Sequence, residues 1–175
     1  MKNKTLYKLS IITLLLLCFT SVKAQQSSNE VLKEAISQAQ QTNKNIMIIF
    51  HASWCSWCKR MDKQMNSENC KALFDKNYVI KHLTVYENTE HKKDENLGAE
   101  EMILKYNNNQ KTGIPFWLIF DEKGNLLTDS KNNGQNMGCP TTKEEVAAFL
   151  DKLKNTSNLN DSQLAIIQKE FEELK

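Results

Sequence analysis

Alternating runs of apolar and helix-periodic residues divide the chain into strand-like and helix-like segments. Uninterrupted apolar runs at residues 46–50 and 116–120 predict two strands that are buried on both faces. Apolar residues at helical spacing predict amphipathic helices over residues 31–39, 55–65 and 99–106. Strands and helices in alternation are typical of an α/β fold, in which helices cover a sheet.

Further segments complete the predicted sheet and its covering. Residues 78–86 carry alternating apolar positions, which predict a parallel strand beside the 46–50 strand in a βαβ unit. A Gly-containing turn after residue 120 predicts a hairpin with residues 126–129. Residues 141–145 offer two alternative capping boxes, each a Thr followed three residues later by a Glu, before the next helix.

Two segments lie outside this alternation. Residues 87–98 begin as a hydrophilic stretch without periodicity, and we interpret them as an insertion. After a linker at residues 155–160, apolar residues at helical spacing predict a further amphipathic helix, namely Leu164, Ile167, Phe171 and Leu174. We expect this helix to pack on its own domain, with binding to a partner as the alternative.

The segment from Trp54 to Lys59, W-C-S-W-C-K, stands where the first predicted strand ends and a helix begins. Cysteines three residues apart on a first helical turn lie on one face and can close a disulfide. Cys55 also stands at the positive end of the helix dipole, near unpaired backbone N–H groups, and both effects favour thiolate over thiol. This arrangement predicts a redox dithiol in which Cys55 is the nucleophile and Cys58 the second thiol.

The same cysteine spacing also serves half of many zinc sites, which need four ligands. The sequence has no second C-x-x-C pair, and Cys70 and Cys139 stand alone. The histidines His51, His82 and His91 do not form the short-spaced pair that zinc sites use. We therefore expect no metal at the dithiol, interpret Cys70 as a small buried apolar residue, and leave the role of Cys139 open.

A strand, then W-C-x-x-C-K opening a helix, and later Thr112-Gly113-Ile114-Pro115-Phe116 before another apolar strand occur in this order. Over residues 31–153 the chain thereby resembles the thioredoxin superfamily, and most of all the secreted bacterial thioredoxin-like disulfide-exchange proteins. The resemblance implies a thioredoxin fold, a central mixed four-stranded sheet flanked by helices, to which this chain adds a C-terminal helix. It also implies that Pro115 follows a cis peptide bond and faces the dithiol, while the Ile114 backbone pairs with the substrate chain.

The resemblance further implies a thiol-disulfide oxidoreductase that needs no cofactor besides the Cys55/Cys58 pair. Its partners would be cysteine-containing client proteins and an upstream redox partner protein. Trp54 and Trp57 are candidate substrate contacts on an apolar rim, whereas Phe116 fits the rim and the core equally well. Two alternatives are a thioredoxin-fold metal carrier or assembly factor that uses the dithiol as a soft ligand pair, and a non-catalytic interaction module.

Residues near the dithiol bear on the direction in which electrons flow. Cytosolic reductases of this family carry a buried Asp beneath the dithiol, and Ile49 stands at the matching position. His51 or Asp62 could replace that Asp, or both could be polar residues at the margin of the site. The dipeptide Ser56-Trp57 matches neither reductases nor strong oxidants. By resemblance we expect a reductase-leaning potential, nearer to about −270 mV than to about −120 mV.

The first residues have the pattern of a secretory signal peptide. A basic start is followed by an apolar run at residues 9–22 and a small-residue cleavage signal that ends at Ala24. Hydroxyl residues interrupt the run, which falls short of the ~20 residues that a membrane-spanning helix needs. Leu16 and Leu17 are too bulky for a lipoprotein signal at Cys18. We therefore expect cleavage after Ala24, no stable membrane insertion, and a periplasmic or secreted protein.

Cleavage would leave a thioredoxin-like domain at residues 25–154 and a C-terminal helical extension at residues 155–175. The whole chain has a formal charge of +2, but four of its 23 basic residues and none of its 21 acidic residues lie in residues 1–24. The remaining 19 basic and 21 acidic residues give no basic field for nucleic acid. Outside the cytosol, where disulfides persist, a dithiol has exchange reactions available in both directions.

Overall fold

The computed structural model describes residues 25–173, and the expected signal peptide at residues 1–24 lies outside them. Its main sheet has four strands in the order β2-β1-β3-β4. The central strands are β1 (Asn45–His51) and β3 (Phe116–Phe120), and the edge strands are β2 (Tyr78–Thr84) and β4 (Leu126–Asp129). β1 pairs in parallel with β2, while β3 is antiparallel to β1 and to β4. The sheet is mixed, as expected from the resemblance to thioredoxins.

The uninterrupted apolar runs occupy the centre of the sheet because only these two strands are covered on both faces. Every residue of β3 and the middle five residues of β1 are buried. Ile48 stands opposite Leu118 of β3 on one side and Lys81 of β2 on the other. Lys81 is tolerated at an edge strand because its ammonium reaches Glu34 at 2.8 Å.

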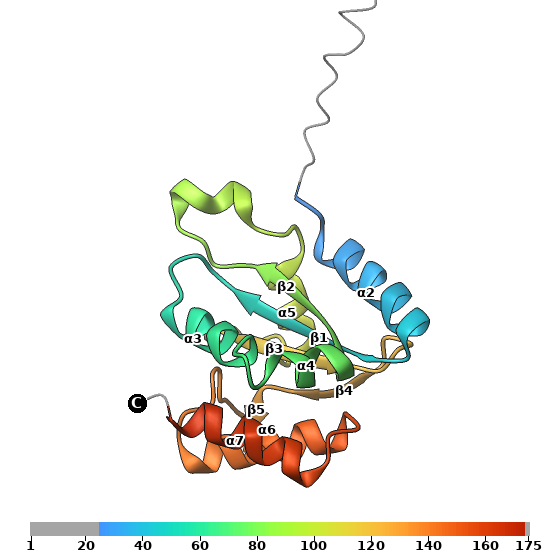
Figure 1. Cartoon of the computed structure of the whole chain (residues 1–175). Helices are drawn as coiled ribbons and strands as arrows, with labels where there is room; N and C mark the ends of the chain where they lie inside the picture. The colour runs from blue at the N-terminus through green and yellow to red at the C-terminus, as the bar shows by residue number, and fades with distance from the viewer. Residues whose placement is uncertain (1–24, 174–175) are drawn as a thin grey trace, which may run out of the picture.

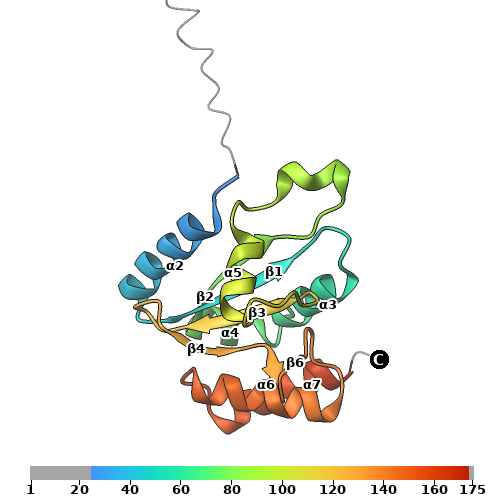
Figure 2. The same cartoon turned by 180° about the vertical axis from the view of Figure 1, so that it is seen from behind.

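Helices cover both faces of the sheet (Figures 1 and 2). On one face lie α2 (Ser28–Thr42) and α5 (Ala99–Tyr106), which pack against alternate residues of β1 and β3. On the other face lie α3 (Ser56–Met65), α4 (Lys71–Asn77), α6 (Lys143–Asn155) and α7 (Asp161–Glu173). Successive side chains of β1 and β3 point alternately toward these two sets of helices, as the pleat of a strand requires.

Helix starts follow the predicted capping chemistry. The Thr142 hydroxyl accepts a hydrogen bond from the Glu145 N–H and the Glu145 carboxylate accepts one from the Thr142 N–H, so this pair forms the capping box of α6. Ser27 and Glu30 form a second capping box at the start of α2. Of the two boxes that the sequence offered before α6, the structure uses the later one.

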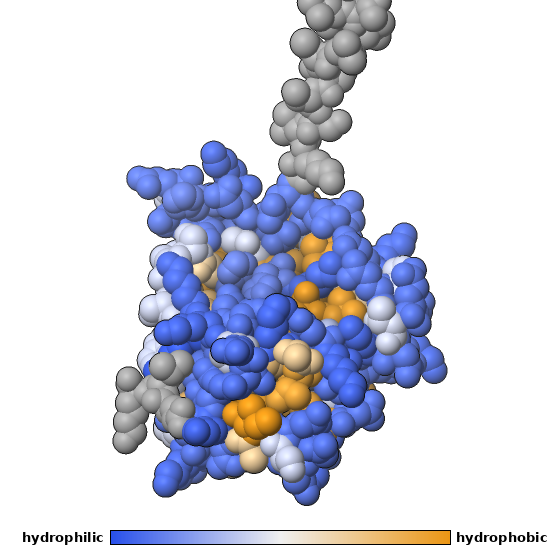
Figure 3. Space-filling view, viewed as in Figure 1, coloured by the Kyte–Doolittle hydropathy of each residue, from blue (hydrophilic) through white to orange (hydrophobic). Residues whose placement is uncertain are grey.

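The predicted C-terminal helix is α7, and it packs on its own domain. Leu164, Ile167 and Phe171 are buried in the same cluster as Phe149 of α6, whose ring lies 5.1 Å from that of Phe171. Leu174, the last residue of the predicted apolar stripe, lies outside the described residues. The face seen in Figure 3 is mostly hydrophilic, and its apolar side chains gather in small patches. No helix within residues 25–173 has the length and apolar character needed to cross a bilayer.

Two segments outside the predicted helices and strands contain short regular structure. Within the loop at residues 131–138, β5 (Lys131–Asn132) and β6 (Gln135–Asn136) form a ribbon. Its turn residues, Asn133 and Gly134, both have positive φ angles, which Asn-Gly adopts at low cost. Within the interpreted insertion lies η1 (Thr89–Asp94), a 3-10 helix that Asn88 caps by accepting the His91 N–H.

Candidate active site

The dithiol lies where the polypeptide leaves the central strand β1 and enters α3. Cys55 is the N-cap residue of α3 and forms a disulfide with Cys58, one turn later, across a Cα–Cα distance of 5.3 Å. The Cys55 sulfur accepts a hydrogen bond from the Cys58 N–H at 3.1 Å. In the reduced state this N–H and the helix dipole both stabilise a negative charge on the Cys55 sulfur. These are the two effects from which the sequence predicts that Cys55 is the nucleophile.

Both sulfurs are shielded in the disulfide form. Cys55 is 3% exposed and Cys58 is 2% exposed, so exposure hardly distinguishes them. They pack with Ala52 and against Ile114. The difference between the two cysteines therefore lies in their position on the helix, with Cys55 at the cap and Cys58 inside the first turn.

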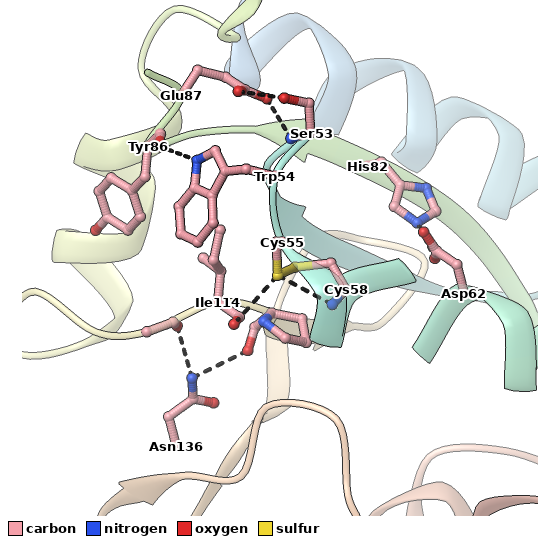
Figure 4. Close-up of a disulfide and its surroundings, with 12 residues drawn as sticks. Ser53, Trp54, Cys55, Cys58, Asp62, His82, Tyr86, Glu87, Ile114 and Asn136 are labelled. Atoms are coloured by element: carbon pink, nitrogen blue, oxygen red, sulfur yellow. Dashed lines mark hydrogen bonds and ion pairs between the residues drawn. A yellow bond between two sulfur atoms is a disulfide. The ribbon is translucent and has the colours of Figure 1, made fainter. Parts of the chain in front are cut away.

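The loop before β3 faces the dithiol, as Figure 4 shows. The Ile114–Pro115 peptide bond is cis, and the Ile114 carbonyl oxygen lies 3.6 Å from the Cys55 sulfur. A disulfide sulfur carries no hydrogen, so this is a contact in the oxidised form and becomes a possible S–H donor only in the reduced form. Among the residues that the structure describes, the Ile114 N–H has no hydrogen-bond partner, and its carbonyl meets only this sulfur.

The two tryptophans beside the cysteines stand out into solvent. Trp54 is 55% exposed and its indole N–H donates to the Tyr86 carbonyl at 2.8 Å, while Trp57 is 50% exposed. The Trp57 ring carries the Arg60 guanidinium 5.3 Å from its centroid. Phe116 is fully buried, so it belongs to the core and not to the rim of the site.

A pocket of about 290 Å³ adjoins the dithiol on the side of Trp57. Its walls combine the loop before β3 with the ribbon and the start of α6, and they are Trp57, Gly113, Ile114, Pro115, Asn136, Met137, Gly138, Cys139, Thr141 and Glu145. Of the six site residues that the sequence analysis named, three therefore line one hollow: Trp57, Ile114 and Pro115. Cys55 and Cys58 adjoin it through Ile114, and Trp54 lies on the other side, against Tyr86.

No carboxylate lies at Ile49, whose side chain is buried among apolar neighbours. A polar cluster of His51, Asp62 and His82 instead lies between β1, α3 and β2. His82 contacts Asp62 with 2.8 Å between ring nitrogen and carboxylate oxygen, and the His51 and His82 rings lie 5.2 Å apart edge to face. Burial, followed by the proximity of His82, lowers the pKa of His51.

Glu87, at the start of the interpreted insertion, contacts the loop that carries the dithiol. Its two carboxylate oxygens accept hydrogen bonds from the Ser53 N–H at 2.5 Å and the Ser53 hydroxyl at 2.7 Å. Glu87 itself is 8% exposed, and its own N–H donates to the Glu95 carboxylate at 2.8 Å. Sequence reasoning missed this contact because no local pattern links residues 34 positions apart.

Asn136 is the second contact that sequence reasoning missed. Its side-chain amide donates to the carbonyls of Gly113 and Pro115, the residues on either side of Ile114. The Asn133-Gly134 turn is a hairpin signal that could have indicated the ribbon carrying Asn136. Nothing in the sequence could have indicated which carbonyls it reaches.

The two remaining described cysteines, Cys70 and Cys139, are free and buried. Burial raises the pKa of Cys70, and it raises the pKa of Cys139 to about 11. The Cys139 thiol donates to the Gln64 side-chain oxygen at 3.3 Å. Both therefore stay protonated near neutral pH. Within residues 25–173, no three His, Cys, Asp or Glu side chains gather in a way that could hold a metal ion.

A family model described as thioredoxin-like matches residues 27–122, more than half of the 175 residues. The solved structure of a disulphide isomerase from Xylella fastidiosa Temecula1 has a TM-score of 0.54 and 18% identity, covering 77% of this chain and 94% of that chain. No curated protein sequence matches the chain.

Two further solved structures are similar at lower scores. One is described as a DsbH oxidoreductase, with TM-score 0.46 and 22% identity over 78% of this chain and 85% of that chain. The other is a thioredoxin from Thermus thermophilus, with TM-score 0.46 and 17% identity over 75% of this chain and 85% of that chain. At 18% identity the disulphide isomerase structure bears on the fold alone, and nothing is argued from the two structures with TM-scores of 0.46.

Proposed function

The chain belongs to the thioredoxin-like family, and from this membership we propose that it is a protein thiol-disulfide oxidoreductase acting through Cys55 and Cys58. The observation that carries the proposal is a single arrangement. The Cys55 sulfur of a disulfide at a helix N-terminus lies 3.6 Å from the Ile114 carbonyl oxygen. The backbone of Ile114 makes no other hydrogen bond in the described chain. An exchange catalyst needs both features, because it must hold an extended chain while one of its sulfurs attacks.

In the reducing direction the steps balance as follows. The Cys55 thiolate attacks one sulfur of a client disulfide, so a mixed disulfide forms and the other client sulfur leaves as a thiolate. The Cys58 thiolate then attacks the Cys55 sulfur, which closes the Cys55–Cys58 disulfide and releases the second client thiolate. The client gains two electrons, and with two protons becomes a dithiol. A dithiol reductant, here assigned to an upstream redox partner protein, returns the Cys55–Cys58 pair to its reduced state.

Each element of the site has a part in this proposal. The N–H of Cys58 and the dipole of α3 favour the thiolate of Cys55. The backbone of Ile114 pairs with the client chain, and Pro115 with Trp57 forms the wall of the adjoining pocket. Trp54 and Trp57 give the client an apolar surface on either side of the cysteine. The reaction needs no cofactor besides the Cys55/Cys58 pair.

We further propose that the clients lie outside the cytoplasm and that the protein acts mainly as a reductase. The first proposal rests on the signal-peptide pattern of residues 1–24. The second rests on the resemblance to secreted thioredoxin-like proteins that keep client cysteines reduced. The dipeptide Ser56-Trp57, which lacks a histidine that would stabilise the Cys55 thiolate, agrees with it, whereas the absence of a carboxylate at Ile49 points the other way. The expected potential lies nearer to about −270 mV than to about −120 mV.

Insulin reduction in the presence of dithiothreitol tests the activity. Wild-type protein should accelerate it, Cys55→Ala should abolish the acceleration, and Cys70→Ala, which removes a distant buried cysteine, should retain it. Cys58→Ala should accumulate a mixed disulfide with the client, because the second attack is missing. Acceleration by Cys55→Ala equal to that of wild type would exclude the proposed function and favour an interaction module.

Two further measurements address direction and the metal-carrier alternative. Equilibration with glutathione buffers should give a reductase-like potential, whereas a pair that stays reduced in buffer rich in oxidised glutathione would identify an oxidant. Zinc or copper retained stoichiometrically by the reduced protein, and lost in Cys55→Ala, would favour the metal carrier.

A further inference from the structure

The side chain of Asn136 uses its whole hydrogen-bonding capacity between the ribbon and the loop that faces the dithiol. Its Nδ2 donates to the Gly113 carbonyl at 2.8 Å and to the Pro115 carbonyl at 3.1 Å. Its Oδ1 accepts from the Ser130 hydroxyl at 2.6 Å and from the Gly138 N–H at 3.0 Å. The amide orientation is fixed, because a flipped amide would point its oxygen at two carbonyls and its NH₂ at a backbone N–H.

Asn136 hydrogen-bonds to one side of this loop, whereas the opposite side of the loop faces the dithiol. The carbonyls of Gly113 and Pro115 are bound by Asn136, whereas the Ile114 carbonyl between them lies 3.6 Å from the Cys55 sulfur. Figure 4 shows Asn136 on the side of the loop away from Cys55. In the described chain, the Ile114 backbone is thus the part of this loop that is presented to the dithiol without a protein partner.

We propose that Asn136 is a positioning residue that fixes the register in which a client chain pairs with Ile114. This inference rests on the proposed function, because register has meaning only if a client pairs there. A one-residue shift in strand pairing turns every side chain to the opposite face. It would therefore carry the client cysteine away from Cys55, and a client whose cysteine is brought back to Cys55 would then lack the aligned backbone contacts with Ile114.

Asn136 can hold the loop in place because the residues that flank the ribbon are themselves closely packed. Ser130 is fully buried, so the donor that orients the Asn136 oxygen is shielded from water. Gly138 has a φ of +62°, and a Cβ built on it would lie 3.5 Å from the Pro115 carbonyl oxygen and 3.6 Å from its ring. Gly138, two residues after Asn136, therefore lies close to Pro115, and a shift of the loop would also have to displace this residue.

The test separates clients that need backbone pairing from disulfides that do not. Asn136→Asp removes both donors to the loop carbonyls and retains acceptors for Ser130 and Gly138. Gln135→Glu is the matched control, since it makes the same amide-to-carboxylate change on the exposed neighbouring side chain of β6. Each protein is assayed with an extended peptide disulfide and with bis(2-hydroxyethyl) disulfide, which has no peptide backbone.

For Asn136→Asp, the KM for the peptide should rise about tenfold while kcat changes less than about twofold, since the lost interaction is a binding one. Turnover of bis(2-hydroxyethyl) disulfide should be unchanged, and Gln135→Glu should match wild type on both substrates. An unchanged peptide KM in Asn136→Asp, or an equal loss on both disulfides, would overturn the positioning role. A wild type that turns over the small disulfide but not the peptide would instead remove the proposed function, and this inference with it.

Thermal unfolding of each variant accompanies the assay. Should Asn136→Asp fail to fold, Asn136→Ala carries the same test, because it removes the amide without adding a charge next to the two carbonyls. The peptide-selective rise in KM is again the expected result, and its absence in a folded variant counts against the proposal.

Discussion

Glu87 accepts both hydrogen bonds that Ser53 can donate, one on each carboxylate oxygen. Ser53 lies two residues before Cys55, and Glu87 follows Tyr86, whose carbonyl holds the Trp54 indole. Two consecutive residues that follow β2 thereby fix two consecutive residues of the dithiol loop. The start of the interpreted insertion thus has a structural role at the site.

Replacing Glu87 with Gln should lower the free energy of unfolding by about 1.5–3 kcal/mol, the usual range for hydrogen bonds to a charged group. Gln keeps one acceptor oxygen but directs an NH₂ group at the second Ser53 donor. Urea denaturation measures the change. The control is Glu90→Gln on η1, where the side chain is exposed and the expected change is within about 0.5 kcal/mol. Equal effects of the two substitutions would contradict the role of Glu87.

His51 should make stability fall as the pH drops below neutrality. Its pKa is held below the ordinary 6.5, first by burial and then by His82, while Asp62 and Glu87 act in the opposite direction. The unfolded chain therefore binds a proton at His51 before the folded protein does. Stability is present above pH 6.5, is lost as the pH falls toward the folded pKa, and levels off below it.

Urea denaturation between pH 7.5 and 5 tests this dependence. His51→Gln should show a smaller loss of stability over this range than wild type. His91→Gln, which changes an exposed histidine of η1, should follow the wild-type curve. Parallel curves for wild type and His51→Gln would show that His51 does not contribute.

Cys139 should resist alkylation in the folded protein. With a pKa of about 11, it is a thiolate in only about one molecule in a thousand at pH 8, and the thiolate is the reactive form. Mass-spectrometric mapping after iodoacetamide treatment should find Cys139 unmodified in native protein and modified in guanidinium chloride. Modification of Cys139 in the native protein at the rate of reduced Cys55 would contradict the assigned burial.

Phe171 should be essential for stability although it lies in the C-terminal extension. It is fully buried against Phe149, and Phe171→Ala should cost about 3–5 kcal/mol through lost burial and the cavity left behind. Ile166→Ala, on the same helix but at a side chain that is 43% exposed, should cost less than about 1 kcal/mol. Chemical denaturation of the two variants compares them directly.

The elements that local patterns specify were predictable. The apolar runs of β1 and β3 indicated central strands because both faces of these strands are covered, and the spacing of Cys55 and Cys58 indicated a helical turn. The ribbon at residues 131–136 was missed because its strands are two residues long and carry no alternation. Its Asn-Gly turn was the one available signal.

The contacts that arrange the site were not predictable in the same way. Ser53 and Glu87, like Asn136 and Gly113, belong to different elements, and each pair meets only through the packing of the whole sheet. Polar residues in loops give no periodic signal, since most of them face solvent. The cysteines could therefore be named from sequence, whereas the residues that hold their surroundings in place could not.

The buried side chain of Gln64 has a consequence for where this domain ends. It lies on α3, the helix of the dithiol, and donates to the carbonyls of Glu170 and Phe171 near the end of α7. The thioredoxin-like family model stops at residue 122, before α6 and α7. An expression vector designed to that boundary would omit both helices and leave Gln64, Met61 and Met65 of the dithiol helix facing water. The shortest fragment worth purifying extends through Phe171, and a C-terminal affinity tag needs a spacer so that the last turn of α7 stays docked on the helix that bears the cysteines.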